Sequence, residues 1–295
     1  MDRQLSAQGF SIGAFFSLFV VFLNPAMAQP KATCEKGPNS GRLSACNELL
    51  EQERSPAELA AIYRNRAQAY SWSGQYDLAV KDYDATLGID PKDAEALYGR
   101  GWAFENMQKH ELAVADADSL LAMGEKANKF AINQLRCRAL TALARFNEAI
   151  DACSQQLRPY ASHIFLVDRG EAYLAAGQYD RAVEDFDAAL KDDTGAVFAK
   201  LGRGKALFAK KDYAMALEQF AQANQMIESS SGEPWPTALS KHGLANEALG
   251  RRSAAIADFQ NALKQWPNLD ESKEGLKRLG VSPAVSNGKK WWRFW

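Results

Sequence analysis

Small residues recur through most of the chain at intervals of 33 to 39 positions, and this spacing restricts how the chain can fold more than any other feature does. One row of them is Ala79, Ala113, Ala149, Ala182, Ala216 and Ala255. A second row stands twelve positions earlier: Ala67, Gly101, Cys137, Gly170, Gly204 and Gly243. Four positions after the first row the residue is usually large: Tyr83, Ala117, Cys153, Phe186, Phe220 and Phe259. Six copies in one register predict a stack of similar units that bury their apolar faces against each other.

The fourth copy, residues 168–190, indicates what one unit is. Two apolar patterns of helical period are separated by a break from Gly177 to Asp180, which predicts two short antiparallel helices. Gly177 is expected to end the first helix in the left-handed conformation that glycine tolerates. Asp180 is expected to begin the second helix, with its carboxylate accepting from free N–H groups. The small residues Gly170 and Ala182 let the two backbones come close, while aromatic rings fill the space around the crossing.

A unit of this length and pattern resembles the tetratricopeptide repeat, and the resemblance extends over residues 60–268. It implies an all-α, right-handed solenoid of antiparallel helix pairs. The closing proline of the family pattern is present only at Pro91 and Pro267. We therefore divide the chain into a signal peptide (1–28), an N-terminal cap with a truncated repeat (29–58), six repeats (59–269), a C-terminal capping helix (270–280) and a flexible aromatic-basic tail (281–295).

The longest interval, 39 positions, separates the fifth and sixth copies. It contains residues 229–236, with the sequence Ser-Ser-Ser-Gly-Glu-Pro-Trp-Pro, whose composition predicts a loop. Insertions in a solenoid often map to one face, so this loop is either a neutral insertion or a contact element that projects from one edge.

The first 28 residues have the anatomy of a secretory signal. The apolar run Ile12 to Leu23 is as long as the apolar region of a signal peptide and is too short to span a membrane comfortably. Ala26-Met27-Ala28 supplies the small residues of a cleavage site, so we expect cleavage before Gln29. We therefore expect a secreted protein, located in the bacterial periplasm. The alternative is an uncleaved membrane anchor.

Four cysteines follow the expected cleavage site, where an oxidising compartment favours pairing. Cys34 and Cys46 flank a turn-rich segment at residues 37–41, and a disulfide there would attach the new N-terminus to the first helix. That helix is predicted at residues 43–53, as the second helix of a truncated repeat. No Cys-x-x-Cys motif occurs, which argues against thiol–disulfide chemistry.

The other two cysteines, Cys137 and Cys153, stand at the small and large packing positions of the third unit. In an antiparallel helix pair the residue opposite Cys137 is expected to be nearer Ala149, about one turn away from Cys153. The Cα separation could then exceed the limit of about 7 Å for a disulfide. Two readings stay open: a disulfide, or two free thiols that act as small apolar residues.

Charged residues repeat in the same register. An arginine precedes the small residue in five units: Arg66, Arg100, Arg136, Arg169 and Arg203. Three units carry an aspartate sixteen positions later, and the sixth unit has a histidine in place of the arginine: Asp82, Asp116, Asp185, and His242 with Asp258. We expect these residues to form ion pairs that join the helices of a unit or adjacent units. Their regularity argues against catalysis, because an active site needs a unique constellation.

No enzyme signature is present. The sequence has no phosphate loop, no nucleophile elbow and no dinucleotide fingerprint. The histidines His110, His163 and His242 occur at different points of different units with no Cys or carboxylate grouping beside them, which argues against a metal site. The formal net charge of −1 gives no reason to expect nucleic-acid binding. We predict no catalytic residue, no metal and no cofactor.

The resemblance implies that the first helix of each unit lines a concave groove that binds a protein or peptide. The groove residues it implies are Arg64, Gln68, Trp72, Tyr98, Trp102, Glu105, Arg138, Glu171, Lys205 and Phe208. Exposed aromatic residues near Arg and Glu are typical of a peptide-binding surface; the alternative is that Trp72 and Trp102 pack between units. Some family members grip a terminal carboxylate through Lys and Asn, but Arg64 and Gln68 stand at those places, which argues against that mode.

The tail is the other singular feature, with three Trp, one Phe and three cations: Lys289, Lys290, Trp291, Trp292, Arg293, Phe294 and Trp295. Three explanations stay open: contact with a membrane surface, recognition by a partner protein, or packing against the last unit. The sequence therefore predicts a non-enzymatic, protein- or peptide-binding scaffold of the periplasm or cell envelope. The alternative is a membrane-peripheral adaptor docked through the tail.

Overall fold

A computed structural model describes residues 30–124, 129–157, 163–191 and 196–283, and these residues form helices with no strand among them. The helices are α1 (Pro30–Lys36), α2 (Asn39–Leu50), α3 (Pro56–Trp72), α4 (Tyr76–Ile89), α5 (Ala94–Asn106), α6 (His110–Ala122), α7 (Lys129–Ala142), α8 (Phe146–Leu157), α9 (His163–Ala175), α10 (Tyr179–Ala189), α11 (Ala196–Ala209), α12 (Tyr213–Ser231), α13 (Pro236–Ala248), α14 (Arg252–Gln265) and α15 (Asp270–Arg278). In the described ranges, no helix combines the length and apolarity that a membrane crossing requires. The predicted signal peptide and the tail from Lys289 to Trp295 lie outside the described residues.

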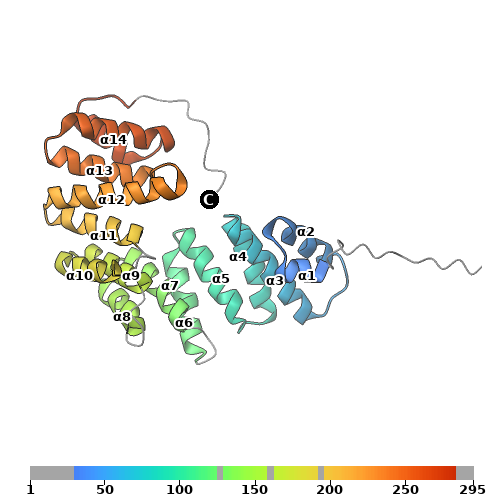
Figure 1. Ribbon diagram of the computed structural model, residues 1–295. Helices are drawn as coiled ribbons and strands as arrows, with labels where there is room; N and C mark the ends of the chain where they lie inside the picture. Colours follow the sequence, from blue (N-terminus) through green and yellow to red (C-terminus); the bar gives the residue numbers. More distant parts are fainter. Residues whose placement is uncertain (1–29, 125–128, 158–162, 192–195, 284–295) are drawn as a thin grey trace, which may run out of the picture.

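Consecutive helices form antiparallel hairpins, α3 with α4 through α13 with α14, and the hairpins follow one another in a curved row (Figure 1). Each second helix packs on the first helix of the next hairpin. First helices also contact one another, as α3 does α5 and α7 does α9. The first helices are therefore the ones that lie on the inner, concave side of the curve. The expected all-α solenoid is confirmed.

The predicted crossings are closely packed. Every alanine of the repeated row on the second helices, from Ala79 to Ala255, is completely buried. A side-chain carbon added at Gly170 would lie 2.8 Å from the ring of Phe186, and Gly204 and Gly243 face the rings of Phe220 and Phe259 in the same way. In the fourth unit, Gly202 of the next hairpin covers the same Phe186 ring. The ring is held between two bare backbones because neither position carries a side chain.

In two units the close helix crossing is formed by different residues. In the second unit Ala117 replaces the ring, and Leu135 of the next hairpin reaches over Gly101 instead, 2.6 Å from where a side-chain carbon would stand. In the third unit Cys137 and Cys153 form a disulfide with a Cα separation of 5.5 Å. The expectation that Cys153 would lie one turn too far away is wrong. Positions sixteen apart also face each other in the fourth, fifth and sixth units, as Gly170 and Phe186 do.

The turn inside each hairpin uses one residue in the left-handed region, with φ from 58° to 74°: Gly74, Gln108, Ala144, Gly177, Lys211 and Gly250. The prediction for Gly177 is confirmed, whereas the prediction for Asp180 is wrong. Helix α10 begins at Tyr179, and its N-cap is Gln178, whose side chain makes no capping bond. Asp180 accepts instead from Nζ of Lys210, the residue directly after α11, at 2.5 Å.

The predicted loop at residues 229–236 is partly wrong, because α12 continues through Ser231 and only residues 232–235 are irregular. The hydroxyls of Ser230 and Ser231 donate to the carbonyl of Ile227, and Gly232 ends the helix with a φ of 81°. Most of the extra length is therefore absorbed by a longer helix. Trp235, directly before α13, packs against Phe198 on α11 with ring centroids 5.5 Å apart.

The N-terminal cap consists of α1 and α2, and the predicted Cys34–Cys46 disulfide joins them with a Cα separation of 4.9 Å. The turn between them is confined to Gly37 and Pro38, so the predicted turn at 37–41 is too long. Helix α2 begins at Asn39, four residues before the predicted start at Leu43. At the other end, α15 buries Leu276 completely and half-buries Leu279, as the sequence predicts for a capping helix.

The turn geometry predicts that Ala144→Gly stabilises the protein. A non-glycine residue loses about 1–2 kcal/mol in the left-handed region, while glycine costs about 0.5–1 kcal/mol in unfolded-state entropy. Because the Ala144 side chain is exposed, its removal loses little packing, and we expect a gain of about 0.5–1 kcal/mol in the free energy of unfolding by urea titration. Gly177→Ala is the matched control: its added carbon would touch nothing within 4 Å, so a loss of about 1 kcal/mol reports the backbone alone. A loss of stability in Ala144→Gly would contradict the turn assignment.

Candidate binding groove

The repeated charges form the expected ladder of ion pairs. Arg66 binds Asp82 through two hydrogen bonds of 2.6 and 2.7 Å, and the pairs Arg100–Asp116, Arg169–Asp185 and His242–Asp258 repeat the contact. Some arginines also reach the preceding hairpin: Arg100 to Asp84, Arg136 to Asp118 and Arg203 to Asp187. Arg66 does the same to Asn47 of the cap. The ladder joins helices and units, so it belongs to the scaffold rather than to a reactive site.

A cavity of about 360 Å³ opens between α3 and α5 at the N-terminal end of the concave side. It is lined by Arg64, Asn65, Gln68, Ser71, Trp72, Tyr76, Tyr83, Glu95, Tyr98, Gly99, Trp102, Ala103 and Asn106. Five of the ten predicted groove residues therefore come together in one place: Arg64, Gln68, Trp72, Tyr98 and Trp102. The adjacent first helices bring them together because the residues lie on one face of each helix.

Three aromatic side chains form the walls of this cavity. Trp72 is the last residue of α3 and is 55% exposed, so it does not pack between units. Trp102 is half-buried against the core, and Tyr98 meets it edge-on one turn away, with ring centroids 6.3 Å apart. The two tryptophans therefore differ: Trp72 does not pack between units, while Trp102 both packs against the core and lines the cavity.

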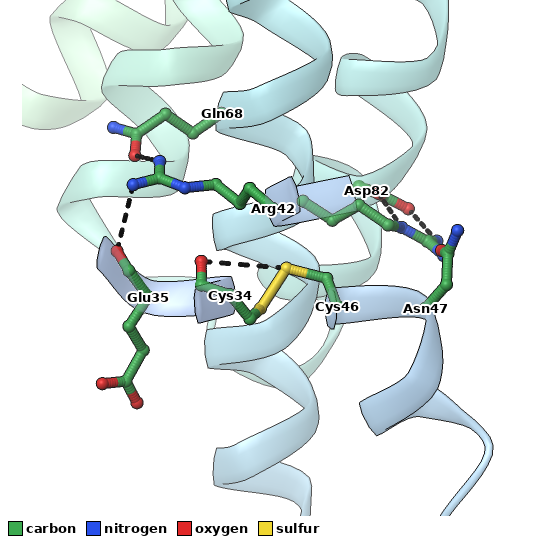
Figure 2. The surroundings of a disulfide bond; sticks show 8 residues. Cys34, Glu35, Arg42, Cys46, Asn47, Gln68 and Asp82 are labelled. Carbon is green, nitrogen blue, oxygen red and sulfur yellow. Dashed lines mark hydrogen bonds and ion pairs between the residues drawn. A yellow bond between two sulfur atoms is a disulfide. The ribbon is translucent and has the colours of Figure 1, made fainter. Parts of the chain in front are cut away.

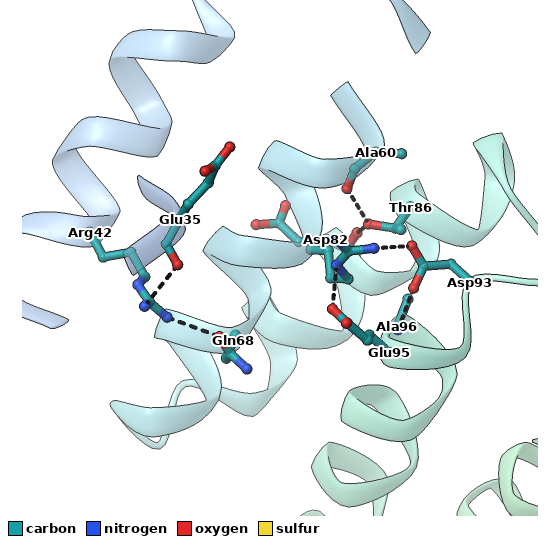
Figure 3. A network of polar contacts seen from close by, with 10 residues as sticks. Glu35, Arg42, Ala60, Gln68, Asp82, Thr86, Asp93, Glu95 and Ala96 are labelled. Atoms are coloured by element: carbon teal, nitrogen blue, oxygen red, sulfur yellow. Dashed lines mark hydrogen bonds and ion pairs between the residues drawn. The ribbon is translucent and has the colours of Figure 1, made fainter. Parts of the chain in front are cut away.

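The floor of the cavity is made by Tyr83 of α4, which reaches across because Gly99 carries no side chain. Burial raises the pKa of the Tyr83 phenol, which therefore stays neutral and polar. At the rim, Arg64 binds Asp93 and also Glu95, with Nε 3.0 Å from the Glu95 carboxylate. Figure 3 labels the two acidic partners, Asp93 and Glu95. A cavity with aromatic walls, a polar floor and a charged rim is suited to one large side chain together with the backbone that carries it.

The other predicted groove residues continue along the concave side, each with a partner. Glu105 lies 2.7 Å from Nδ1 of His110 and 3.9 Å from Nε of Arg138. Lys205 donates to Glu171 at 2.8 Å, bridging two units. Phe208 is half-buried and lies against the ring of Tyr213, 5.1 Å between centroids. Glu105, Arg138, Glu171 and Lys205 thus form a row of alternating charge, whereas Phe208 contributes mainly to packing.

Asp168, on the first helix α9 of its unit, is a titratable residue that sequence reasoning missed. Nε2 of Gln134, in the preceding unit, donates to its carboxylate at 3.1 Å. Burial raises the pKa of Asp168 to about 6. The hydrogen bond from Gln134 and the positive charge of Arg138 act in the opposite direction and lower this pKa. The sequence did hold a signal: Asp168 is placed two positions before the small residue, where Gly99 and Gly202 stand in other units.

Arg42 was also missed, because it belongs to the cap and stands outside the repeating register. Its guanidinium carbon lies 4.6 Å from the ring centroid of Trp72, and it donates to Gln68. Within the described ranges, no cluster of three or more His, Cys, Asp or Glu residues could hold a metal ion. The predicted contact of the tail, Lys289 to Trp295, falls outside the described residues and stays a prediction.

Comparison with known families identifies the repeat. A sequence profile described as the tetratricopeptide repeat matches residues 64–128 and 167–231. A second profile with the same description matches residues 237–269. Together these matches cover more than half of the chain, and they lie inside residues 59–269, which the sequence assigns to six repeats.

Similar proteins of known sequence or structure carry the same kind of repeat. Human tetratricopeptide repeat protein 13 is 27% identical over 61% of this chain, and the DnaJ protein P58IPK homolog B of Oryza sativa subsp. japonica is 29% identical over 85%. The chain spans only 22% and 52% of the length of these two relatives.

Among solved structures, the fold is similar to that of a tetratricopeptide repeat protein from Parabacteroides merdae ATCC 43184. That match has a TM-score of 0.71 and 18% identity, and covers 85% of this chain and 96% of the other. The fold is also similar to that of PilW, described as a widely conserved type IV pilus biogenesis factor. Here the TM-score is 0.62 at 18% identity, with coverage of 74% and 98%. At this level of identity the likeness shows the fold alone.

The burial of Asp168 predicts a stability that depends on pH. In the unfolded chain the carboxyl loses its proton near pH 4, whereas in the folded protein it keeps the proton until about pH 6. Stability contributed by this group is therefore lost as the pH rises from 4 to 6. We expect Asp168→Asn to raise the free energy of unfolding by about 1–3 kcal/mol at pH 7.5 and by little at pH 4.

Urea titrations of the wild type and the variant at pH 4, 5, 6 and 7.5 measure this difference. Asp180→Asn serves as the control, because its side chain is 82% exposed beside Lys210 and should contribute little. A gain in Asp168→Asn that is the same at every pH would contradict the assignment.

Proposed function

The chain belongs to the tetratricopeptide repeat family, whose solenoids are protein-interaction folds, and from this premise we propose that it is a non-enzymatic scaffold that binds a peptide segment of a partner protein in its concave groove. We place the scaffold in the bacterial periplasm or cell envelope. The partner is a protein or peptide, and its segment lies across α3 and α5 and continues along the row of first helices.

The aromatic cavity between α3 and α5 is the observation that carries the proposal. Its volume of about 360 Å³ admits one large side chain or two small ones. Trp72, Tyr98 and Trp102 offer apolar area at a low cost in side-chain entropy, which is why such residues dominate interface energetics. Asn106 donates its amide to the carbonyl of Trp102 at 2.8 Å, which leaves its oxygen as an acceptor for a peptide N–H.

The row of residues beyond the cavity supports an extended ligand. Trp102, Arg138, Glu171 and Lys205 stand one position after the small residue in four consecutive units, so each unit presents one side chain at the same height on its first helix. The side chains of Arg138, Glu171 and Lys205 are 49%, 37% and 38% exposed. A peptide along this row would meet an aromatic ring and then charges of alternating sign. Such a charge pattern contributes more to discrimination between peptide sequences than to binding affinity.

Two further observations support the compartment. The first 28 residues have the features of a secretory signal. All the described cysteines are paired in disulfides, Cys34 with Cys46 and Cys137 with Cys153, and disulfides persist in oxidising spaces. We therefore place the folded protein outside the cytoplasm.

The compartment predicts the first residue of the native protein. If the leader is removed after Ala28, mass spectrometry of protein purified from the periplasmic fraction will find Gln29 at the N-terminus. Protein that retains Met1 and is recovered with the membranes would contradict the proposal and favour the uncleaved anchor.

The groove predicts which tryptophans a ligand needs. A random 12-residue peptide library displayed on phage, selected against the mature chain, should yield binders whose affinity falls at least 10-fold in Trp72→Ala and in Trp102→Ala, measured by titration calorimetry. Such a loss is of the size that truncation of a central interface aromatic gives. Helical circular dichroism should be unchanged for Trp72→Ala, since that ring is mostly exposed.

Trp266→Ala is the matched control for this experiment. Trp266 is 50% exposed but lies at the end of α14, four hairpins along the row from the cavity. Its replacement should leave the affinity unchanged. Selected peptides that bind the Trp72→Ala/Trp102→Ala double variant as tightly as the wild type would show that the groove is not the binding surface.

A further inference from the structure

One cation of the N-terminal cap is buried between three groups, one on α1 and two on α3. Arg42 lies in the first turn of α2 and is only 6% exposed. One nitrogen, Nη1, donates to Oε1 of Gln68 on α3 at 2.9 Å, and the other, Nη2, donates to the carbonyl of Glu35 on α1 at 3.2 Å. The guanidinium carbon lies over the ring of Trp72, 4.6 Å from its centroid. Figures 2 and 3 show Arg42 reaching from the cap to Gln68.

None of these partners is a carboxylate, so Arg42 differs from the arginines of the ladder. A guanidinium taken out of water needs hydrogen bonds and favourable charge around it. Glu35 lies in the last turn of α1, where helix carbonyls lack partners and carry partial negative charge. The indole face adds a cation–π contact. The three contacts together stabilise the buried charge, although Nε of Arg42 is buried without a hydrogen-bond partner.

The contact with Gln68 sets the direction of that amide. A guanidinium has only donors, so the atom of Gln68 that faces Arg42 must be its oxygen. The amide nitrogen, with two N–H donors, is then turned away from Arg42 (Figure 3). Gln68 is exposed and lines the cavity, so these donors are available to a carbonyl or carboxylate oxygen of a bound peptide.

The Cys34–Cys46 disulfide holds the other end of this arrangement. Cys34 is adjacent to Glu35, and Cys46 lies one turn along α2 from Arg42, with both sulfurs buried (Figure 2). A helix of seven residues such as α1 is far too short to be stable alone. Its position, and with it the Glu35 carbonyl, therefore depends on the bridge and on packing against α2 and Ile62 of α3.

We infer that the cap contributes to peptide binding in the groove and that Arg42 is a positioning residue. The disulfide-linked cap holds Arg42, which orients the Gln68 amide and fixes the Trp72 ring at the mouth of the cavity. This inference rests on the proposed function. It adds that the N-terminal end of the groove recognises a peptide oxygen at Gln68 beside the side chain that enters the aromatic cavity. It also makes groove geometry depend on one of the two disulfides and not on the other.

The first arm of the test needs no ligand. Nitrogen-15 NMR of the mature chain, with the Gln68 amide assigned by Gln68→Ala and the Trp72 indole by Trp72→Phe, reports both side chains. We expect Arg42→Gln to shift both sets of resonances and to bring the two Gln68 amide protons closer in frequency. Arg42→Lys keeps the charge without the two-pronged geometry and should give an intermediate shift. If neither variant moves the Gln68 resonances, Arg42 does not position this amide.

The second arm uses a peptide selected on the wild type from the 12-residue library. We expect affinity to fall about 5- to 20-fold in Arg42→Gln and in Cys34→Ser/Cys46→Ser, with a smaller loss in Arg42→Lys. The matched control is Cys137→Ser/Cys153→Ser, which removes a buried disulfide of the third unit and should leave the affinity unchanged at a temperature where all variants are folded by circular dichroism. Equal losses in both disulfide variants, or none in Arg42→Gln, would overturn the inference.

The two arms separate the inference from the proposed function. If no peptide can be selected, the proposed function fails, while the NMR arm still decides whether Arg42 orients Gln68. If peptides bind through Trp72 and Trp102 but are indifferent to Arg42 and to the Cys34–Cys46 bridge, the proposed function stands and the role of the cap is excluded.

Discussion

The whole architecture depends on a close contact between a residue with almost no side chain on the first helix of each hairpin and a bulky residue sixteen positions later. Where the pair is Gly170 and Phe186, the ring fills space that any larger residue at position 170 would occupy. Where the ring is missing, another group takes its place: Leu135 over Gly101, or the Cys137–Cys153 disulfide. The contact sets how closely two helices approach, so every hairpin has nearly the same shape and can stack on the next.

Uniform hairpins have a functional consequence, because they place equivalent side chains in rows. The first helices contact one another along the inner side of the curve (Figure 1). Residues one position after each small residue then form a continuous line from Gln68 to Lys205. The cap ends this line: Arg42, which belongs to no repeat, binds Gln68 and covers Trp72. The regular units provide the row, and the irregular cap makes its first position chemically distinct.

Periodicity explains what could be predicted from the sequence and what could not. The hairpins and the buried alanines repeat in six copies, and the pairs from Arg66–Asp82 onward repeat in four units, so each inference rested on several copies in one register. Two features occur only once, so no repetition in the sequence pointed to them. They are Arg42 in the cap and Asp168, which stands where the second and fifth units have Gly99 and Gly202. The distance between Cys137 and Cys153 could not be derived by counting residues from the turn of the hairpin. The correct facing position is given by the pairs sixteen positions apart in the other units. The extended α12 was missed because serine and glycine composition suggests a loop, whereas serine hydroxyls can bond back to the helix.

The central claim is that the concave side, closed by the cap, is the binding surface. Hydrogen–deuterium exchange with mass spectrometry, on the mature oxidised chain with and without a selected peptide, tests it most directly. The account predicts slower exchange in α3, α5 and the α1–α2 cap, and little change in the second helices α6 and α8, which do not line the cavity. Protection confined to the second helices, on the convex side, would contradict it.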